Sequence, residues 1–280
     1  MIGLILWGMA LFYNAPEERE MTERMTPVTW QGNFWGPEAA RARKEGKLPP
    51  ISMTPQMQRW DRWGRQVLKS GDIVFRLGDA RLMHGYFPMS RFYANTSNSK
   101  FSHTAIVSIE DEEEGPVVYD TTRTSVARQP FAVWVLDNVG SIGVKRLRPQ
   151  YRKEIPRITA FCRQIFESQP PFDYELSLDD KAYYCVEMTE KAFRSAGLPL
   201  SEPVRLGDME RATEKPIPMF VIMYSSKFFL DRPLSFEHPV YFPGNDRHGI
   251  WSSPKLETVV PPTFAPGYPG LDRGAGGVVR

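Results

Sequence analysis

The sequence is poor in the features that would assign it to several large classes of protein. It has two cysteines in 280 residues, so no disulfide framework can be read from it. Its 35 Lys and Arg residues against 33 Asp and Glu leave a net charge of +2, which is too small to indicate a nucleic-acid partner. No Cys/His spacing is that of a zinc site, and no glycine-rich phosphate loop occurs. We therefore expect no metal, no nucleotide cofactor and no nucleic-acid ligand.

The apolar run at the N-terminus, residues 2–13, is too short to be a membrane-spanning helix, which needs about 20 residues. Its length fits the hydrophobic part of a signal peptide. However, no Lys or Arg precedes it, and residues 12–15 (Phe-Tyr-Asn-Ala) make a poor cleavage site. Localisation stays open between the cytoplasm and a periplasmic or cell-envelope location reached by export or membrane attachment through this segment.

The composition is that of an ordinary globular protein, with 41% hydrophobic and 24% charged residues. A chain of this length can bury a sizeable core. Its 25 prolines are about twice the usual share. Because they gather in connecting and terminal segments, we expect long, ordered loops.

Hydrophobic periodicity and turn residues predict an α+β fold, in which a group of strands is followed by helices. Thr54 is a plausible N-cap for the second of two early helices, and Gly71 lies just past its end. Residues 77–100 are expected to form a long loop beside a substrate cleft. The expected helices are 36–47, 54–69, 156–168 and 184–196, and the expected strands are 72–76, 104–109, 117–120, 131–136 and 143–147.

The two cysteines occupy different positions in their expected helices. Cys162 lies in the apolar stripe of helix 156–168 and reads as a small buried hydrophobe. Cys185 lies near the start of the next helix, where the thiol points toward the sheet and a strand histidine could meet it. A nucleophilic cysteine needs a thiolate, stabilised by an imidazole or a helix N-terminus. The helical spacing alone also fits a plain core cysteine at position 185, and a Cys162–Cys185 disulfide is a further alternative.

His103 opens the strand 104–109, and an acidic turn joins that strand to the next one. A hairpin centred near residues 112–113 places Asp120 opposite Ala105 and makes it a diagonal neighbour of His103 on one face. A shift of one residue would present Tyr119 instead. Strand position alone favours the alternative, in which His103 is a capped strand-end histidine without a chemical task. We expect His84 to be a solvated loop residue, and His238 and His248 to make structural hydrogen bonds.

Four short motifs in this order resemble those of the permuted papain-like amidases. They are residues 71–75 (GDIVF), 102–107 (SHTAIV), 172–174 (FDY) and 183–187 (YYCVE). This family is the circularly permuted branch of the NlpC-type cysteine peptidase superfamily, with lecithin:retinol acyltransferase as a relative. As in that family, the histidine precedes the cysteine, which is the reverse of the order in papain. The resemblance covers about residues 71–199.

The resemblance implies a papain-like core, in which the helix bearing Cys185 packs on an antiparallel sheet bearing His103. Asp120 falls at the family's third polar position, where Glu or His is more usual, and Val186 stands where the family usually has Ser. The chain is expected to divide into an N-terminal hydrophobic and helical extension (1–70), the catalytic core (71–200), a covering appendage (201–260) and a loose tail (261–280).

The expected function is a cysteine hydrolase that cleaves a peptide or N-acyl amide bond through a thioester. In this hypothesis Cys185 is the nucleophile, His103 the base and Asp120 the group that orients the imidazole. Substrate contacts are expected from Tyr184, Ser102 and Tyr119, the last being the alternative third member of the site. Candidate substrates are a peptide, a peptidoglycan fragment or an acyl lipid. The alternatives are an acyltransferase using the same thioester, and a catalytically silent binding module.

Overall fold

The computed structural model describes residues 37–48, 53–80, 89–112, 114–121, 125–209 and 234–264. The N-terminal apolar segment, His84 and all of the expected tail beyond residue 264 lie outside these ranges. Within them, no helix is both long enough and apolar enough to cross a membrane.

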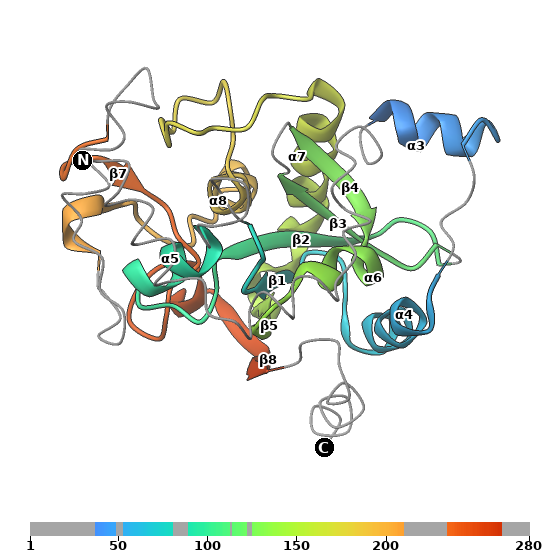
Figure 1. The fold of residues 1–280 in the computed structure, drawn as a ribbon, viewed down its shortest axis with the longest axis horizontal. Helices are drawn as coiled ribbons and strands as arrows, with labels where there is room; N and C mark the ends of the chain where they lie inside the picture. The colour runs from blue at the N-terminus through green and yellow to red at the C-terminus, as the bar shows by residue number, and fades with distance from the viewer. Residues whose placement is uncertain are drawn as a thin grey trace, which may run out of the picture.

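A six-stranded antiparallel sheet forms the centre of the molecule, with strand order β4-β3-β2-β1-β5-β8 (Figure 1). Its last strand, β8, spans residues 256–264, which were expected to belong partly to the covering appendage and, from residue 261, to the loose tail. It instead pairs with β5 at one edge of this sheet. A second, two-stranded sheet joins β6 (Val204–Arg205) to β7 (Pro239–Val240). The central strands are β1 (Ile73–Arg76), β2 (His103–Ile109), β3 (Pro116–Thr121), β4 (Val126–Pro130), β5 (Ser141–Leu147) and β8 (Leu256–Phe264).

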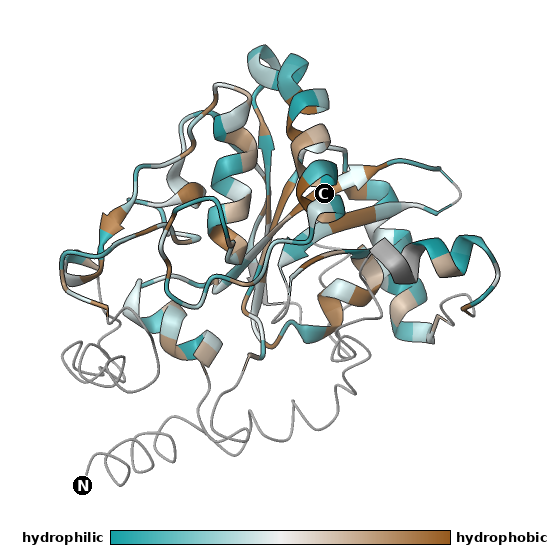
Figure 2. Cartoon of the chain, turned by 90° about the horizontal axis from the view of Figure 1, so that it is seen from above, coloured by the Kyte–Doolittle hydropathy of each residue, from teal (hydrophilic) through white to brown (hydrophobic). Residues whose placement is uncertain are grey.

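Helices cover both faces of the sheet. One face packs against α7 (Ile155–Ser168) and α8 (Cys185–Ser195), and the other against α4 (Pro55–Val67) and α6 (Phe131–Trp134) (Figure 1). Figure 2 shows that the helices carry both hydrophobic and hydrophilic residues, as amphipathic elements flanking a core do. The remaining elements are α3 (Pro37–Lys44), α5 (Met89–Thr96), η3 (Val135–Asp137), η4 (Pro149–Glu154), η5 (Leu206–Asp208) and η6 (Ile250–Ser252).

The start of α4 is as predicted, with the hydroxyl of Thr54 accepting the backbone N–H of Met57 at 3.2 Å. The helix then buries two tryptophans against α6. Trp63 stacks on Phe131 with ring centroids 5.6 Å apart, and Trp60 meets the same ring edge-on at 6.0 Å. This aromatic packing holds the start of α6 against α4.

Two expected elements were wrong. Residues 131–136 were expected to be a strand but form α6 and η3, and the strand is the preceding segment, β4. Residues 131–134 are all buried and apolar, and such a run does not distinguish helix from strand by its period. The expected loop 77–100 contains α5, whose Phe92 and Ala94 are buried. That helix is short and rich in polar residues, so it is held by tertiary packing more than by an apolar stripe.

Candidate active site

Cys185 is the first residue of α8. The N-cap residue before it, Tyr184, is extended, and its backbone N–H donates to the carboxylate of Glu187 at 3.3 Å. The cysteine side chain is buried, with the sulfur 4.0 Å from the carbonyl oxygen of Ser102. A helix N-terminus carries partial positive charge, which favours a thiolate at this position.

Two threonines tie the first turn of α8 to β2. The hydroxyls of Thr104 and Thr189 lie 2.9 Å apart and share a hydrogen bond, and the carbonyl oxygen of Cys185 lies within hydrogen-bonding distance of both, at 3.4 and 3.1 Å respectively. All of these groups are buried, where hydrogen bonds are not weakened by competing water. The backbone of the cysteine is therefore fixed against the strand residue that follows His103.

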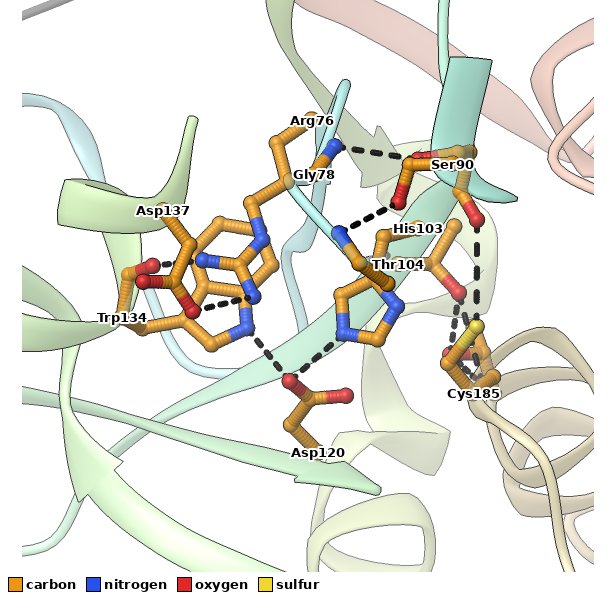
Figure 3. A network of polar contacts seen from close by, with 12 residues as sticks. Arg76, Gly78, Ser90, His103, Thr104, Asp120, Trp134, Asp137 and Cys185 are labelled. Atoms are coloured by element: carbon orange, nitrogen blue, oxygen red, sulfur yellow. Dashed lines mark hydrogen bonds and ion pairs between the residues drawn. The ribbon is translucent and has the colours of Figure 1, made fainter. Parts of the chain in front are cut away.

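His103 and Asp120 meet as the hairpin register predicted. Tyr119 pairs with Ile106, so the next position places Asp120 opposite Ala105 and diagonal to His103. The Nε2 of His103 lies 2.7 Å from the Oδ2 of Asp120, a carboxylate that is 2% exposed. Figure 3 shows the imidazole ring between Asp120 and the sulfur of Cys185. Because Nε2 engages the carboxylate, Nδ1 is the nitrogen left for the thiol.

The His103 imidazole lies beside the thiol at the end of β2. It does not project from the face of the sheet that packs on α8. Side chains alternate along a strand, so His103 shares a face with Ala105 and Val107, which pack under α4 and α6. Thr104 instead faces α8. The meeting point of the thiol and the histidine is therefore the end of β2, at the edge of both faces. As the first residue of β2, His103 can lie beside Cys185 all the same (Figure 3).

The surroundings of His103 favour its charged form. Burial alone would lower the pKa of the imidazole, but the negative charges of Asp120 and Cys185, with a hydrogen bond from the ring to each, raise this pKa to about 10. The ring is therefore held as an imidazolium at neutral pH. An imidazolium beside a thiol stabilises the thiolate, which is the reactive form of cysteine.

Sequence reasoning missed two residues of this network. The indole N–H of Trp134 donates to the same Oδ2 of Asp120 at 2.6 Å, and the indole lies nearly parallel to the imidazole of His103. The guanidinium of Arg76 lies 4.1 Å over the Trp134 ring. Arg76 pairs in register with His103 across β1 and β2, which strand alternation could have revealed. Trp134 gave no such signal, because its segment was expected to be a strand.

Of the expected substrate-contact residues, Ser102 lies nearest the thiol. Its carbonyl oxygen is the group near the Cys185 sulfur, and its hydroxyl accepts the backbone N–H of Gly78 at 3.0 Å. It therefore links the segment after β1 to the start of β2. No bound substrate tests the expected contact from Ser102, which stays a prediction.

The two tyrosines both make internal contacts. The hydroxyl of Tyr184 donates to the carbonyl of Tyr241 at 3.0 Å and accepts its N–H at 2.6 Å. Tyr119 packs on Phe166 of α7 and donates its hydroxyl to Glu110 at 2.5 Å. Tyr119 thus lies on the opposite face of β3 from Asp120, and the structure joins Asp120 to His103 in its place.

Cys162, His238 and His248 take the structural places expected of them. Cys162 and Cys185 are both free, so the alternative of a disulfide was wrong. Cys162 is fully buried, and burial raises the pKa of its thiol. The Nε2 of His238 lies 2.8 Å from the carbonyl oxygen of Leu176, and that of His248 lies 3.1 Å from the amide of Asn245. Among the described residues, no group of three or more His, Cys, Asp or Glu side chains could hold a metal ion.

The fold and this arrangement define a class of protein. A thiol at the start of a helix, facing an imidazole and a carboxylate from an antiparallel sheet, is the papain-like arrangement, here with the histidine strand before the cysteine helix. A family model described as permuted papain-like amidase enzyme, YaeF/YiiX, C92 family, matches residues 67–260. The chain belongs to this family, which implies an activity of the cysteine-hydrolase type.

A solved structure supports the fold. The chain is similar to the crystal structure of metalloprotein yiiX from Escherichia coli O157:H7, with a TM-score of 0.55 and 19% sequence identity. The match covers 70% of this chain and 98% of the other. No curated protein matches the sequence.

Proposed function

We propose that the protein is a cysteine hydrolase that cleaves an amide bond, in a peptide or an N-acyl compound, through a thioester on Cys185. The observation that carries this proposal is the position of the His103 imidazole, bonded to a buried carboxylate on one side and adjacent to a helix-start thiol on the other. Membership of an amidase family supports the choice of an amide as the bond cleaved.

The chemistry follows from these three groups. The sulfur of Cys185 attacks the substrate carbonyl carbon, and the resulting oxyanion collapses with cleavage of the C–N bond. The imidazolium of His103 gives its proton to the departing amine, leaving a thioester and a neutral imidazole. That imidazole then takes a proton from water as the water attacks the thioester. Cleavage of the C–S bond releases the acid and restores the ion pair, while Asp120 keeps Nδ1 directed at the sulfur.

The backbone N–H of Cys185 is the proposed donor to the oxyanion. The first N–H groups of a helix have no partner within the helix, and they point along its axis toward the N-terminus. Such a preorganised donor stabilises negative charge on the carbonyl oxygen in the transition state. The threonine bonds to the Cys185 carbonyl hold the following peptide unit, between Cys185 and Val186, and so steady the first turn of α8 from which this N–H projects.

The test is direct detection of the acyl-enzyme. Wild type, Cys185→Ala and His103→Ala are each incubated with an N-acyl amino acid, a peptidoglycan stem peptide and a long-chain N-acyl amine. Intact mass is recorded during turnover. The expected result is an adduct of acyl mass on Cys185 of the wild type with at least one substrate, and no adduct on Cys185→Ala. Turnover by Cys185→Ala would overturn the proposal.

The same experiment separates the rival functions. In the presence of an added amine or lipid acceptor, a hydrolase continues to release the free acid as its main product. An acyltransferase instead delivers the acyl group to the acceptor. Binding of a substrate that is unchanged in Cys185→Ala, without turnover of any amide by the wild type, would indicate a binding module.

A further inference from the structure

We propose that Trp134, held in place by Arg76, is a positioning residue that directs the Asp120 carboxylate at His103. This inference deepens the proposed function and rests on it for its catalytic meaning. It concerns a group that never touches substrate. It accounts for a buried hydrogen bond and a buried cation that the three reacting groups alone leave unexplained.

The carboxylate of Asp120 is held in an unsymmetrical way. Its Oδ2 accepts both the imidazole of His103, at 2.7 Å, and the indole N–H of Trp134, at 2.6 Å. Its Oδ1 is buried and has no hydrogen-bond partner within the described part of the chain. Rotation of the carboxylate would break two short bonds at once. The indole therefore fixes which oxygen the imidazole meets.

Arg76 holds the indole from the neighbouring strand. Its guanidinium lies over the Trp134 ring, donates to the backbone carbonyl of Trp134, and lies 3.5 Å from the carboxylate of Asp137. A cation above an indole is attracted by the ring's negative face, and this attraction is stronger when both groups are buried. The cation also draws electron density from the ring, so the indole N–H becomes a better donor to Asp120.

The indole affects the reactivity of the Cys185 thiol through Asp120 and His103. With the indole bond in place, Asp120 supports the imidazolium of His103, and the imidazolium supports the thiolate of Cys185. Without that bond, the carboxylate is free to turn its unpartnered oxygen toward the ring, and the imidazolium loses its fixed direction. The sulfur is then a slower nucleophile, because the cation beside it is no longer fixed in direction.

The experiment measures the rate of alkylation of Cys185 by iodoacetamide between pH 5 and 9, in a Cys162→Ala background. Trp134→Phe keeps an aromatic ring but loses the N–H. Trp60→Phe is the matched control, since Trp60 is buried in the same core and its N–H has no partner in the described residues. Trp134→Phe is expected to react about tenfold more slowly at pH 6, and its rate–pH curve is expected to shift to higher pH by about one pH unit. Trp60→Phe is expected to follow the parent curve.

Superimposed curves for Trp134→Phe and Trp60→Phe would overturn the inference. If Trp134→Phe does not fold, benzothienylalanine at position 134 retains the shape of the indole without its N–H, and the same shift is expected. This readout needs no substrate. If only the role of Trp134 is wrong, the acyl-enzyme on Cys185 is still detected and the alkylation shift is absent. If only the proposed function is wrong, no acyl-enzyme is detected and the alkylation shift remains.

Discussion

Two neighbouring helices, α7 and α8, cover the same face of the sheet, and each carries one buried cysteine (Figure 1). Cys162 is 0% exposed and Cys185 is 8% exposed, so burial does not separate them. Their positions do. Cys162 lies in the middle of α7, and Cys185 is the first residue of α8.

The buried surfaces of the two helices also differ in polarity. Around Cys162, the buried residues of α7 are apolar, and the pKa of the thiol is raised by burial. The buried surface of α8 includes Glu187 and Glu190, each with partners: Lys191 and the N–H of Tyr184 for the first, the N–H groups of Leu200 and Ser201 for the second. The comparison teaches that helix position and polar partners, and not exposure, decide whether a buried thiol can react.

The largest expected effect separates the two cysteines. Cys185→Ala is expected to lower turnover by at least about 10³-fold, since it removes the attacking atom. Cys162→Ala is expected to leave turnover within about twofold and to lower the free energy of unfolding by about 1 kcal/mol, because it removes a buried sulfur from a packed core. Steady-state kinetics and urea denaturation of both variants measure these changes. Equal losses of activity in the two variants would break the comparison.

The next effect tests the third member of the site. Asp120→Asn is expected to lower kcat/KM by about 10³-fold, because the charge that supports the His103 imidazolium is removed and the tautomer is no longer imposed. Tyr119→Phe, one residue away on the opposite face of β3, is expected to stay within about twofold. If Tyr119→Phe is the more damaging change, the assignment of Asp120 fails.

The pH dependence of the free energy of unfolding follows from the pair of His103 and Asp120. The pKa of His103 is raised to about 10 from its usual 6.5, so the folded state holds a proton that the unfolded chain releases. This stabilisation is complete below about pH 6.5 and is lost as the pH rises through 10. The difference in unfolding free energy between wild type and His103→Gln is expected to shrink steadily from pH 7 to 10.5 in urea titrations. In an Asp120→Asn background the slope should be flatter, and an unchanged slope there would exclude Asp120 as its cause.

The parts of this site that could be predicted from sequence are those set by local patterns. The acidic turn and the alternation of the two flanking strands gave the register that joins Asp120 to His103. Away from the site, the N-cap Thr54 also follows from nearby residues. These features depend on neighbours within a few positions in the chain.

The parts that could not be predicted depend on distant partners. The strand β8 is defined by its pairing with β5, far away in the chain, and its own residues carry no turn signal that would tie it to the sheet. Trp134 lies in a run of four apolar residues whose helical form is imposed by packing on α4. Charged side chains are seldom fully buried, and the burial of Glu187 and Glu190 depends on Lys191 and the loop at Leu200, which satisfy them.

The smallest expected effect returns to the two helices through their threonines. Thr189→Val removes the hydroxyl that lies 2.9 Å from Thr104 and donates to the Cys185 carbonyl, and it keeps the side-chain shape. A loss of about 1 kcal/mol in unfolding free energy is expected, with Cys185 alkylated about two- to threefold more slowly, because the first turn of α8 is less firmly held. The matched change on α7 is Thr159→Val, because the Thr159 hydroxyl bonds two carbonyls of its own helix. That variant should stay within about 0.5 kcal/mol of the wild type with unchanged alkylation. Identical alkylation rates in the two variants would show that the link from α8 to β2 does not contribute to the placement of the thiol.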